Sequence, residues 1–272
     1  MKMRSLVIMA TILFMPVGTV QAGAWYGGEF SANISMVSNQ DPNTKAVGKL
    51  FVGKNKVRAE GTVGSQTRIV ILDTQNHKAW TLMPDRKEYH EGIAGPVPPK
   101  PDMDPLPDDA DSMCNKGKGV TCQKVGMEAL SGAQADKWEL TMQGKDGKQT
   151  NMTIWADNKR HIILRQVTQN GPTTERRQAG VEMINGRDTE RWEFTMAYQG
   201  KSQNFTQWVD SKLRIPVRMA GQQNAFTSEI MGIQEGPQAD ELFTVPQGYR
   251  QVEPPRQENP PQQPQQPQQP AR

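Results

Sequence analysis

The sequence predicts a mainly β protein in which one large antiparallel sheet curls into an incomplete β-barrel, with few helices. Helical periodicity is scarce, strand-like segments recur with turn residues between them, and one group of strand-like segments occurs as an internal repeat of two copies. The pattern predicts about twelve strands joined by successive hairpins. Sheets of more than about ten strands rarely stay flat, so we expect this one to curl and to present alternate side chains on a concave face.

The chain divides into three parts. We expect a signal peptide at residues 1–22, a single β domain at residues 23–252, and a disordered tail rich in Pro and Gln at residues 253–272. Such a tail cannot bury enough apolar surface to offset its ordering entropy, and it favours the polyproline II conformation. It is either a solubilising extension or a tether that threads cell-wall polymer or docks a partner.

The N-terminus is typical of a secretory signal. Lys2 and Arg4 precede an apolar run, Ser5–Met15, that is too short to span a membrane. Small residues then predict cleavage between Ala22 and Gly23, and the alternative is a short N-terminal anchor helix. No Cys follows the apolar run, so we do not expect a lipoprotein. The mature protein is expected in the periplasm or outside the cell, with only peripheral contact to membranes.

The charge balance gives no support for nucleic-acid binding. Removing Lys2 and Arg4 lowers the formal net charge from +3 to +1, because residues 1–22 contain no acidic residue. A near-neutral surface lacks the basic patch by which proteins bind nucleic acid.

Cys114 and Cys122 are the only cysteines. In an oxidising compartment, a pair this close is typical of a structural disulfide, here around a loop rich in Gly and Lys. Metal binding would need further ligands at a suitable spacing, and the sequence offers none. We therefore expect neither a metal nor another cofactor.

The sequence also gives no sign of catalysis. His77, His90 and His161 are isolated, and there is no P-loop, zinc-protease or serine-hydrolase motif. The fifteen Met residues raise the alternative of a copper carrier. They are dispersed, however, as apolar filler is. The prediction is a protein that is not an enzyme.

The first strands and hairpins follow from local patterns. Alternate residues of Phe30–Val37 are apolar, as in a half-buried strand. Two hairpins follow, with turns at Gly53–Lys56 and Thr74–His77. Ala94–Asp111, rich in Pro and Asp, is expected to be a long exposed loop or a lid. Near the end of the domain, Pro237–Phe243 predicts a short helical turn.

Residues 125–166 and 179–219 are two copies of one unit, with a period of 53–54 residues. Each copy predicts a turn containing Gly, two strands that each carry Trp, and a strand with Ile and Arg. The copies share aromatic, apolar and Gly positions rather than a catalytic set, which indicates a common architecture.

The Trp residues of the repeat allow two interpretations. They fill the core of the sheet, or they line a cavity for a lipid or another apolar ligand, since apolar pockets with few polar groups suit such ligands. Trp80 is a candidate fifth equivalent. The candidate ligand-binding residues are therefore Trp80, Trp138, Trp155, Trp192 and Trp208.

The charged residues of the repeat are expected to have structural roles. These roles are turn formation by Asp157 and Asp210, and ion pairs of Arg165 and Arg218 with Glu139 and Glu193. The two Glu residues alternate with apolar neighbours, so we expect them to face solvent.

A series of short motifs runs through the domain in a fixed order: Gly48–Val52, Lys56–Arg58, Ile71–Asp73, Ala79–Leu82, Lys87–Tyr89, Gly126, Glu128, Gly132, Trp138, Trp155–Asp157 and Leu242–Tyr249. This order, over roughly residues 28–251, resembles the LolA/LolB-like periplasmic lipoprotein-carrier superfamily, and more closely the DUF4412-type secreted proteins. The resemblance implies an open β-barrel around an apolar cavity for acyl chains. This chain differs in having few segments that could form covering helices.

Together these patterns favour a non-enzymatic periplasmic protein. It would bind an apolar ligand, a lipid or the acyl chains of a lipoprotein, in the concave face of a curled sheet. The alternative is an envelope interaction or structural protein that uses a sheet edge and its Pro/Gln tail to hold a protein partner.

The signal peptide gives the first testable prediction. When the full chain is expressed in a bacterium, we expect the protein from the periplasm to begin at Gly23, because cleavage follows the small residues before it. N-terminal sequencing and the intact mass measure this directly. A protein that keeps Met1 and stays with the membrane fraction would support the anchor helix instead.

Overall fold

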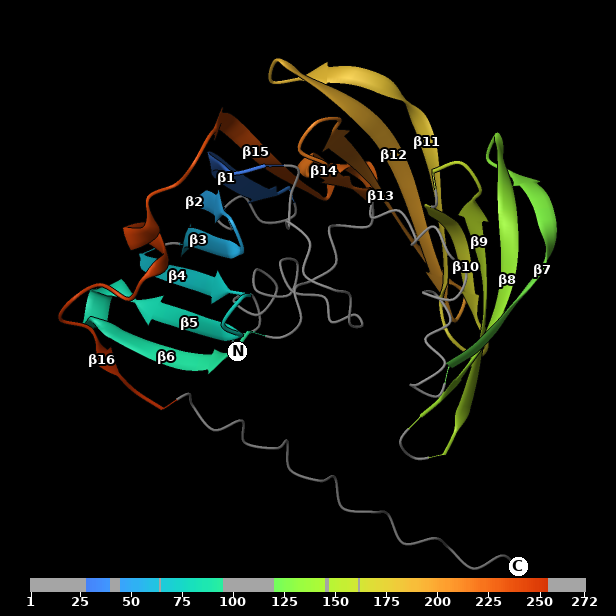
Figure 1. Cartoon of the computed structure of the whole chain (residues 1–272). Coiled ribbons are helices and arrows are strands. Elements are labelled where there is room, and N and C mark those ends of the chain that lie inside the picture. The colour runs from blue at the N-terminus through green and yellow to red at the C-terminus, as the bar shows by residue number, and fades with distance from the viewer. Residues whose placement is uncertain are drawn as a thin grey trace, which may run out of the picture.

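The computed structural model describes residues 28–39, 45–63, 65–94, 120–144, 147–160 and 162–253. In this part of the chain, sixteen strands hydrogen-bond into one sheet in the order β16-β6-β5-β4-β3-β2-β1-β15-β14-β13-β12-β11-β10-β9-β8-β7. The sheet curls strongly and its two edges do not join (Figure 1). The predicted fold class, a mainly β protein with one large curled sheet, is confirmed.

The N-terminal arm is a series of antiparallel hairpins. Its strands are β1 (Phe30–Ser38), β2 (Ala46–Gly53), β3 (Lys56–Val63), β4 (Gln66–Asp73), β5 (Lys78–Met83) and β6 (Glu88–Ile93). Both predicted hairpins are confirmed, because Gly53 pairs with Lys56 and Asp73 pairs with Lys78. A 3-10 helix, η1 (Pro84–Arg86), leads into β6.

The C-terminal arm starts at the opposite edge of the sheet and returns to β1. Its strands are β7 (Val120–Leu130), β8 (Ala133–Gln143), β9 (Gln149–Asp157), β10 (Ile163–Thr168), β11 (Thr173–Ile184), β12 (Arg187–Tyr198), β13 (Lys201–Asp210), β14 (Pro216–Gly221) and β15 (Phe226–Glu235). Between β14 and β15 lies η2 (Gln222–Asn224). The strand β15 pairs antiparallel with β1 and so joins the two arms.

The chain then crosses back to the N-terminal arm. The 3-10 helix η3 (Asp240–Phe243) falls where the sequence predicts a short helical turn. The last strand, β16 (Arg250–Gln251), pairs in parallel with β6 at the edge of the sheet. The predicted signal peptide, almost all of the 94–111 loop, His161, Cys114 and nearly the whole tail lie outside the described residues.

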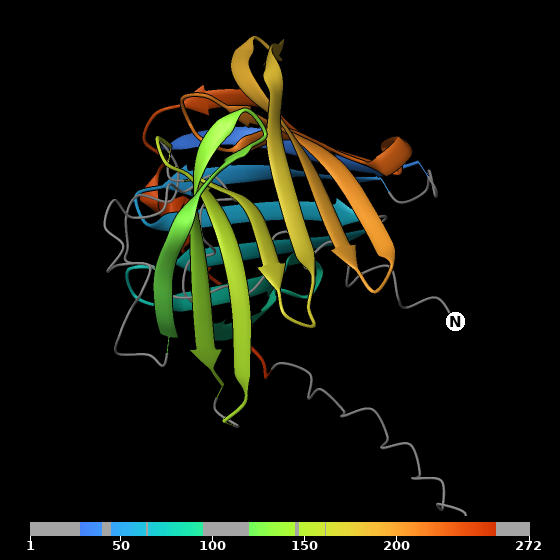
Figure 2. The ribbon, with the colours of Figure 1, turned by 90° about the vertical axis from the view of Figure 1, so that its right-hand side faces the viewer.

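Side-chain alternation gives the sheet two faces. We call the side turned toward the opposite arm the inner face, and the other side the outer face. The helix η3 packs on the outer face, where Phe243 is buried with Ile71 and Leu82. Figure 2 shows the C-terminal arm from its outer side, with the N-terminal strands behind it. No helix of the described residues is long and apolar enough to cross a membrane.

The main core lies on the inner face, where the two arms meet. Phe30 and Ala32 point inward from β1, and Ile34 continues the row, as the alternation of that strand predicts. They pack with Leu213 and Ile215 of the β13–β14 loop. The core therefore joins strands that are far apart in the sequence.

The two copies of the repeat fold into β7–β10 and β11–β14, four antiparallel strands each. Their first hairpins turn at Ser131-Gly132 and Asn185-Gly186, with positive φ at all four residues. Two consecutive residues with positive φ are typical of the tight turn that matches the twist of paired strands. Each copy also has a bulge at the same place, before Gly126 in β7 and before Gly180 in β11.

The structure has sixteen strands where the sequence predicts about twelve. Among those missed are β7 and β11, the first strands of the two units. Most of their side chains are exposed on both faces, so their sequences lack the apolar alternation that identifies a strand. They form because their hairpin partners β8 and β12 supply the hydrogen bonds.

The two Asp residues of the repeat do form turns, as predicted. Asp157 Oδ1 accepts hydrogen bonds from the backbone N–H groups of Lys159 (2.8 Å) and Arg160 (3.0 Å). Asp210 Oδ1 likewise accepts from Lys212 (2.9 Å) and Leu213 (2.6 Å). Asp210 is 1% exposed and its second oxygen also pairs with Arg187. This ion pair raises the pKa of the Arg187 guanidinium.

We expect Asp210→Ala to lower the free energy of unfolding by about 3 kcal/mol, since it removes two hydrogen bonds and leaves Arg187 without its buried partner. The matched control is Asp157→Ala, which removes the equivalent turn bonds at a half-buried position and should cost only about 1 kcal/mol. Urea unfolding followed by circular dichroism measures both. Equal losses would contradict a special role for the buried ion pair.

Candidate functional site

The inner face carries a band of apolar side chains that stay half-buried. It runs over both arms of the sheet. Its members are Ile34, Met36, Ala59, Val70, Ala79, Trp138, Leu140, Met142, Met152, Met196, Phe205, Met219 and Ile230. We call this set the inner apolar band. Binding of a ligand that covers a half-exposed apolar surface of this kind is favourable, because it removes apolar area from water.

The five candidate Trp residues do not share one face. Trp138 pairs with Ile154 and Trp192 pairs with Gln207, and both Trp side chains lie on the inner face. Trp155 follows Ile154 and therefore points outward. By the same register, Trp208 and Trp80 also lie on the outer face. The structure thus brings two of the five together on the concave side and places three on the other.

The outer Trp side chains are covered by basic side chains from neighbouring strands. Lys137 Nζ and Arg165 Cζ each lie 5.0 Å from the centre of the Trp155 ring. Arg218 Cζ lies 4.9 Å from that of Trp208. A cation over an aromatic face is attracted by the ring quadrupole. These outer Trp residues therefore have a structural partner already.

Carboxylates complete this arrangement. The indole N–H of Trp155 donates to Glu128 (2.9 Å), and that of Trp80 donates to Glu91 (3.2 Å). Hydrogen bonds from Lys137 and then from Trp155 lower the pKa of the Glu128 carboxyl. The outer face thus alternates aromatic, basic and acidic groups in cross-strand rows.

Arg165 and Arg218 do form ion pairs, but the predicted acidic partners, Glu139 and Glu193, are wrong. Arg165 pairs with Glu175 (3.0 Å) and Arg218 with Glu229 (3.4 Å), on the strand next to each arginine. Each acid lies directly opposite its arginine in the antiparallel ladder. Glu193 pairs instead with Arg177. Register across the sheet, which the sequence does not state, decides the partner.

The inner Trp192 is held by a polar cluster that sequence patterns did not reveal. Its indole N–H donates to Glu190 (3.0 Å), and Arg160 lies 5.2 Å above its ring. Arg160 (2.8 Å) and Arg214 (3.3 Å) both pair with Glu190. Burial alone would raise the pKa of the Glu190 carboxyl, but the hydrogen bonds from Arg160 and Trp192 outweigh it and lower the pKa.

A pocket of about 640 Å³ lies beside this cluster. Trp192, Leu164, Arg160 and Gln178 contribute to its wall, together with the β7–β8 turn. Its size is that of an ordinary small-molecule site. The pocket combines Trp192 and Leu164 with the amides of Gln134 and Gln178 and the charged groups of Asp157, Lys159 and Arg160, so it suits an amphipathic ligand better than a purely apolar one.

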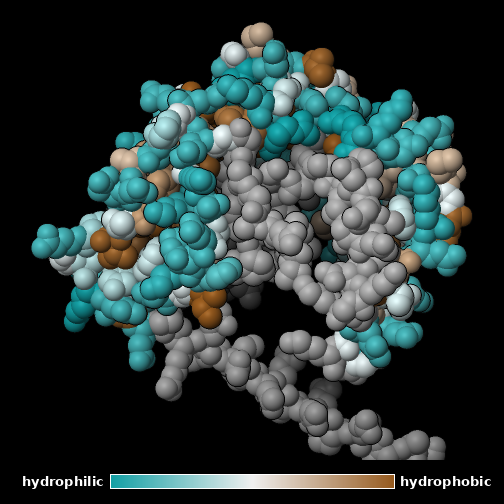
Figure 3. Space-filling view, viewed as in Figure 1, coloured by the Kyte–Doolittle hydropathy of each residue, from teal (hydrophilic) through white to brown (hydrophobic). Residues whose placement is uncertain are grey.

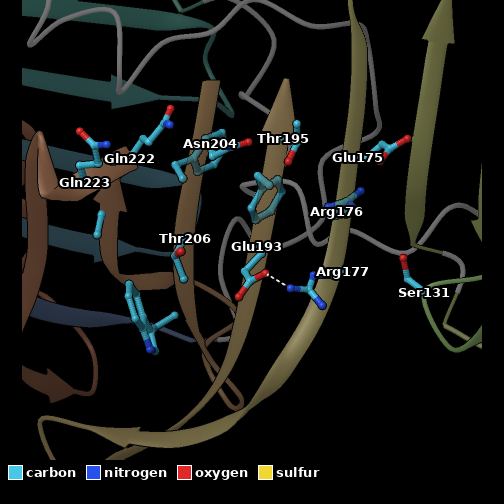
Figure 4. A pocket seen from close by; sticks show the side chains of 15 residues that line it. Ser131, Glu175, Arg176, Arg177, Glu193, Thr195, Asn204, Thr206, Gln222 and Gln223 are labelled. Carbon is cyan, nitrogen blue, oxygen red and sulfur yellow. Dashed lines mark hydrogen bonds and ion pairs between the residues drawn. The ribbon is translucent and has the colours of Figure 1, made fainter. Parts of the chain in front are cut away.

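A second pocket, of about 570 Å³, lies over β11–β14 (Figure 4), and side chains of both faces line it, Glu193 and Thr206 from the outer face and Phe205 from the inner face. Glu193 and Arg177 point toward one another across it, at 2.5 Å. Asn204, Thr206 and Gln222 add hydrogen-bonding groups to its wall. This pocket is polar, and the ion pair at its centre leaves no single charge that would select a ligand.

The two described histidines lie in the N-terminal arm, apart from the residues that line the two pockets. On the side seen in Figure 3, hydrophilic side chains cover most of the described surface, and apolar ones form small separate groups. His77 lies in the β4–β5 turn, and His90 Nδ1 lies 3.0 Å from the carbonyl oxygen of Val252. In the described ranges, no group of three His, Cys, Asp or Glu residues could hold a metal ion.

Comparisons with known proteins give only distant likenesses. No protein-family model matches the chain, and no curated protein matches it either. Among solved structures, a LolA superfamily protein from Nitrosomonas europaea is 12% identical, with a TM-score of 0.37, over 89% of this chain and 96% of that one. A putative outer membrane lipoprotein-sorting protein domain from Vibrio parahaemolyticus is 12% identical, with a TM-score of 0.34, over 79% and 89%.

A third solved structure, a DUF1329 family protein from Desulfovibrio piger, is also 12% identical, with a TM-score of 0.33, over 79% of this chain and 88% of that one. The first of these three belongs to the superfamily that the sequence resembles. At TM-scores below 0.5, such likenesses are too weak to assign a function.

The Glu190 cluster predicts a pH-dependent stability. Because its pKa is lowered in the folded state, Glu190 stabilises the protein above the unfolded pKa of about 4.3, and this contribution disappears as the pH falls through the lower folded value. We expect Glu190→Gln to cost about 1–2 kcal/mol at pH 7. The difference from the unsubstituted protein should be smaller at pH 3 than at pH 7, because the contribution declines as the pH falls below the unfolded pKa. Urea unfolding at both pH values measures it, and a constant difference would contradict the prediction.

Proposed function

We propose that this protein is a non-enzymatic carrier of the cell envelope that binds an apolar ligand, such as a lipid or the acyl chains of a lipoprotein, against the inner face of its sheet. The observation behind the proposal is the inner apolar band, which spans both arms and remains half-buried. Covering such side chains contributes roughly 25 cal/mol per Å² of apolar surface.

The outer face supports the same proposal by contrast. Its Trp rings are stacked with arginine and lysine side chains, and their neighbours form ion pairs. Met152 and Leu140 on the inner face lie opposite one another, with Cys122 and Thr168 as their next ladder neighbours, so no charged residue stands in this register row. An apolar ligand would therefore find its complementary surface on the concave side.

The finer identity of the protein is part of this proposal. We place it in the periplasm or outside the cell, without a lipid anchor, and among the DUF4412-type relatives of the LolA/LolB-like superfamily. The basis is the signal-like N-terminus, the lack of a Cys after it, and the order of short motifs from Gly48 to Tyr249.

A second candidate function is the holding of a protein partner at a sheet edge. It is favoured by β16, which pairs with β6 and so starts the C-terminal tail at one edge of the sheet. The backbone N–H of Arg250 donates to Lys87, and that of Val252 donates to Tyr89. A partner that crosslinks to the full protein and is lost when residues 254–272 are removed would favour this function.

The carrier proposal is tested with a fluorescent fatty acid and the protein of residues 23–272. We expect micromolar binding, and we expect Met152→Lys to weaken it about tenfold or more, because a charge is costly against an acyl chain. The matched control is Asn151→Lys, which places the same charge at the adjacent exposed position of the outer face. Fluorescence titration measures both variants.

Two results would contradict the carrier proposal. One is the absence of binding by the unsubstituted protein at micromolar concentrations. The other is an equal effect of the two substitutions, which would show that the ligand does not distinguish the faces. Thermal unfolding of both variants checks that each still folds.

A further inference from the structure

Gln207 is a buried polar side chain of the inner face whose amide oxygen has no hydrogen-bond partner among the described residues. Gln207 of β13 is 4% exposed, and its Oε1 atom accepts no hydrogen bond from the described residues. Its Cα lies opposite Trp192 on one side and Met219 on the other. An acceptor buried in this way costs about 1–3 kcal/mol if nothing donates to it.

The repeat shows that the fold does not need an amide at this position. The equivalent residue of the first copy is Ile154, which lies opposite Trp138 as Gln207 lies opposite Trp192. Ile154 is 3% exposed, so the two positions are buried alike. An aliphatic side chain therefore packs well at the equivalent buried position of the first repeat unit.

The direct neighbours of Gln207 on its own face of the sheet are apolar. Along the strand, Phe205 and Val209 share its face, and both belong with Trp192 to one packed cluster. Phe205 stacks on Phe194 at 4.7 Å between ring centres. The amide oxygen is therefore a hydrogen-bonding group whose direct neighbours in the ladder, Trp192 and Met219, and along the strand, Phe205 and Val209, are apolar. A polar group placed in this way can fix the orientation of an otherwise apolar ligand.

We propose that Gln207 Oε1 accepts a hydrogen bond from the ligand of the inner face, and that this ligand carries an N–H or O–H donor within its apolar region. An amide-linked or hydroxylated acyl chain has such a donor, whereas a simple ester or a hydrocarbon chain does not. The inference rests on the proposed carrier function and adds the chemical class of its ligand.

The test compares two neutral probes that differ in one group. N-methyldodecanamide has an N–H donor, and methyl dodecanoate has an ester oxygen in its place. Dissociation constants are measured for both, by displacement of a fluorescent fatty acid, with the protein of residues 23–272 and with Gln207→Ile. We expect the preference for the amide over the ester to fall by about five- to tenfold in Gln207→Ile, as one hydrogen bond predicts.

The substitution copies the residue that the first repeat unit has, so it should fold. Because it removes an unpaired acceptor, we expect its thermal unfolding temperature to be equal or higher. Gln203→Ile is the control: it removes an amide from the same strand and face at an exposed position, and it should leave the probe preference unchanged.

The outcomes separate the two proposals. If both probes bind and their ratio is the same in the unsubstituted protein and in Gln207→Ile, the hydrogen bond is refuted while the carrier function stands. If Gln203→Ile changes the ratio as much as Gln207→Ile, the assignment to Gln207 is also wrong. If neither probe binds the unsubstituted protein, the carrier function fails and this inference fails with it.

Discussion

The pairing of β1 with β15 is the interaction on which the rest of the structure depends. It runs from Phe30 opposite Glu235 to Ser38 opposite Phe226, and among the strands of the described residues it alone connects the ladder of the N-terminal arm with that of the C-terminal arm. Without it the chain would be two separate meanders, and neither would have an opposite arm to face. The pair closes a loop of nearly two hundred residues, so we expect it to form late and slowly.

Much of the fold could be predicted because hairpins carry local signals. The turns at Gly53–Lys56 and Thr74–His77, and the Asp-centred turns at Asp157 and Asp210, follow from residues that favour tight turns. The strands β7 and β11 were missed since their side chains face water on both sides. The pairing of β1 with β15 left no local pattern either.

The site was less predictable, because a face is set by register between strands. The sequence shows that Trp138 and Trp155 recur as Trp192 and Trp208, but only the pairing of Trp138 with Ile154 shows that the two members of a copy point in opposite directions. The cluster around Glu190 joins residues from three separate segments, so no spacing rule could find it. The exchange of Ile154 for Gln207 between copies was visible in the sequence, although its burial was not.

The bulge in β7 has a consequence for how separate molecules meet. An unclosed sheet has two edges, and a long regular edge strand can extend its ladder into another molecule. In the described part of the chain, the edge strand β7 is broken by the bulge before Gly126 and carries Lys124 and Glu128. The other edge ends in β16, only two residues long. Both features discourage the stacking of sheets edge to edge, so a sheet can stay open without becoming a template for fibres.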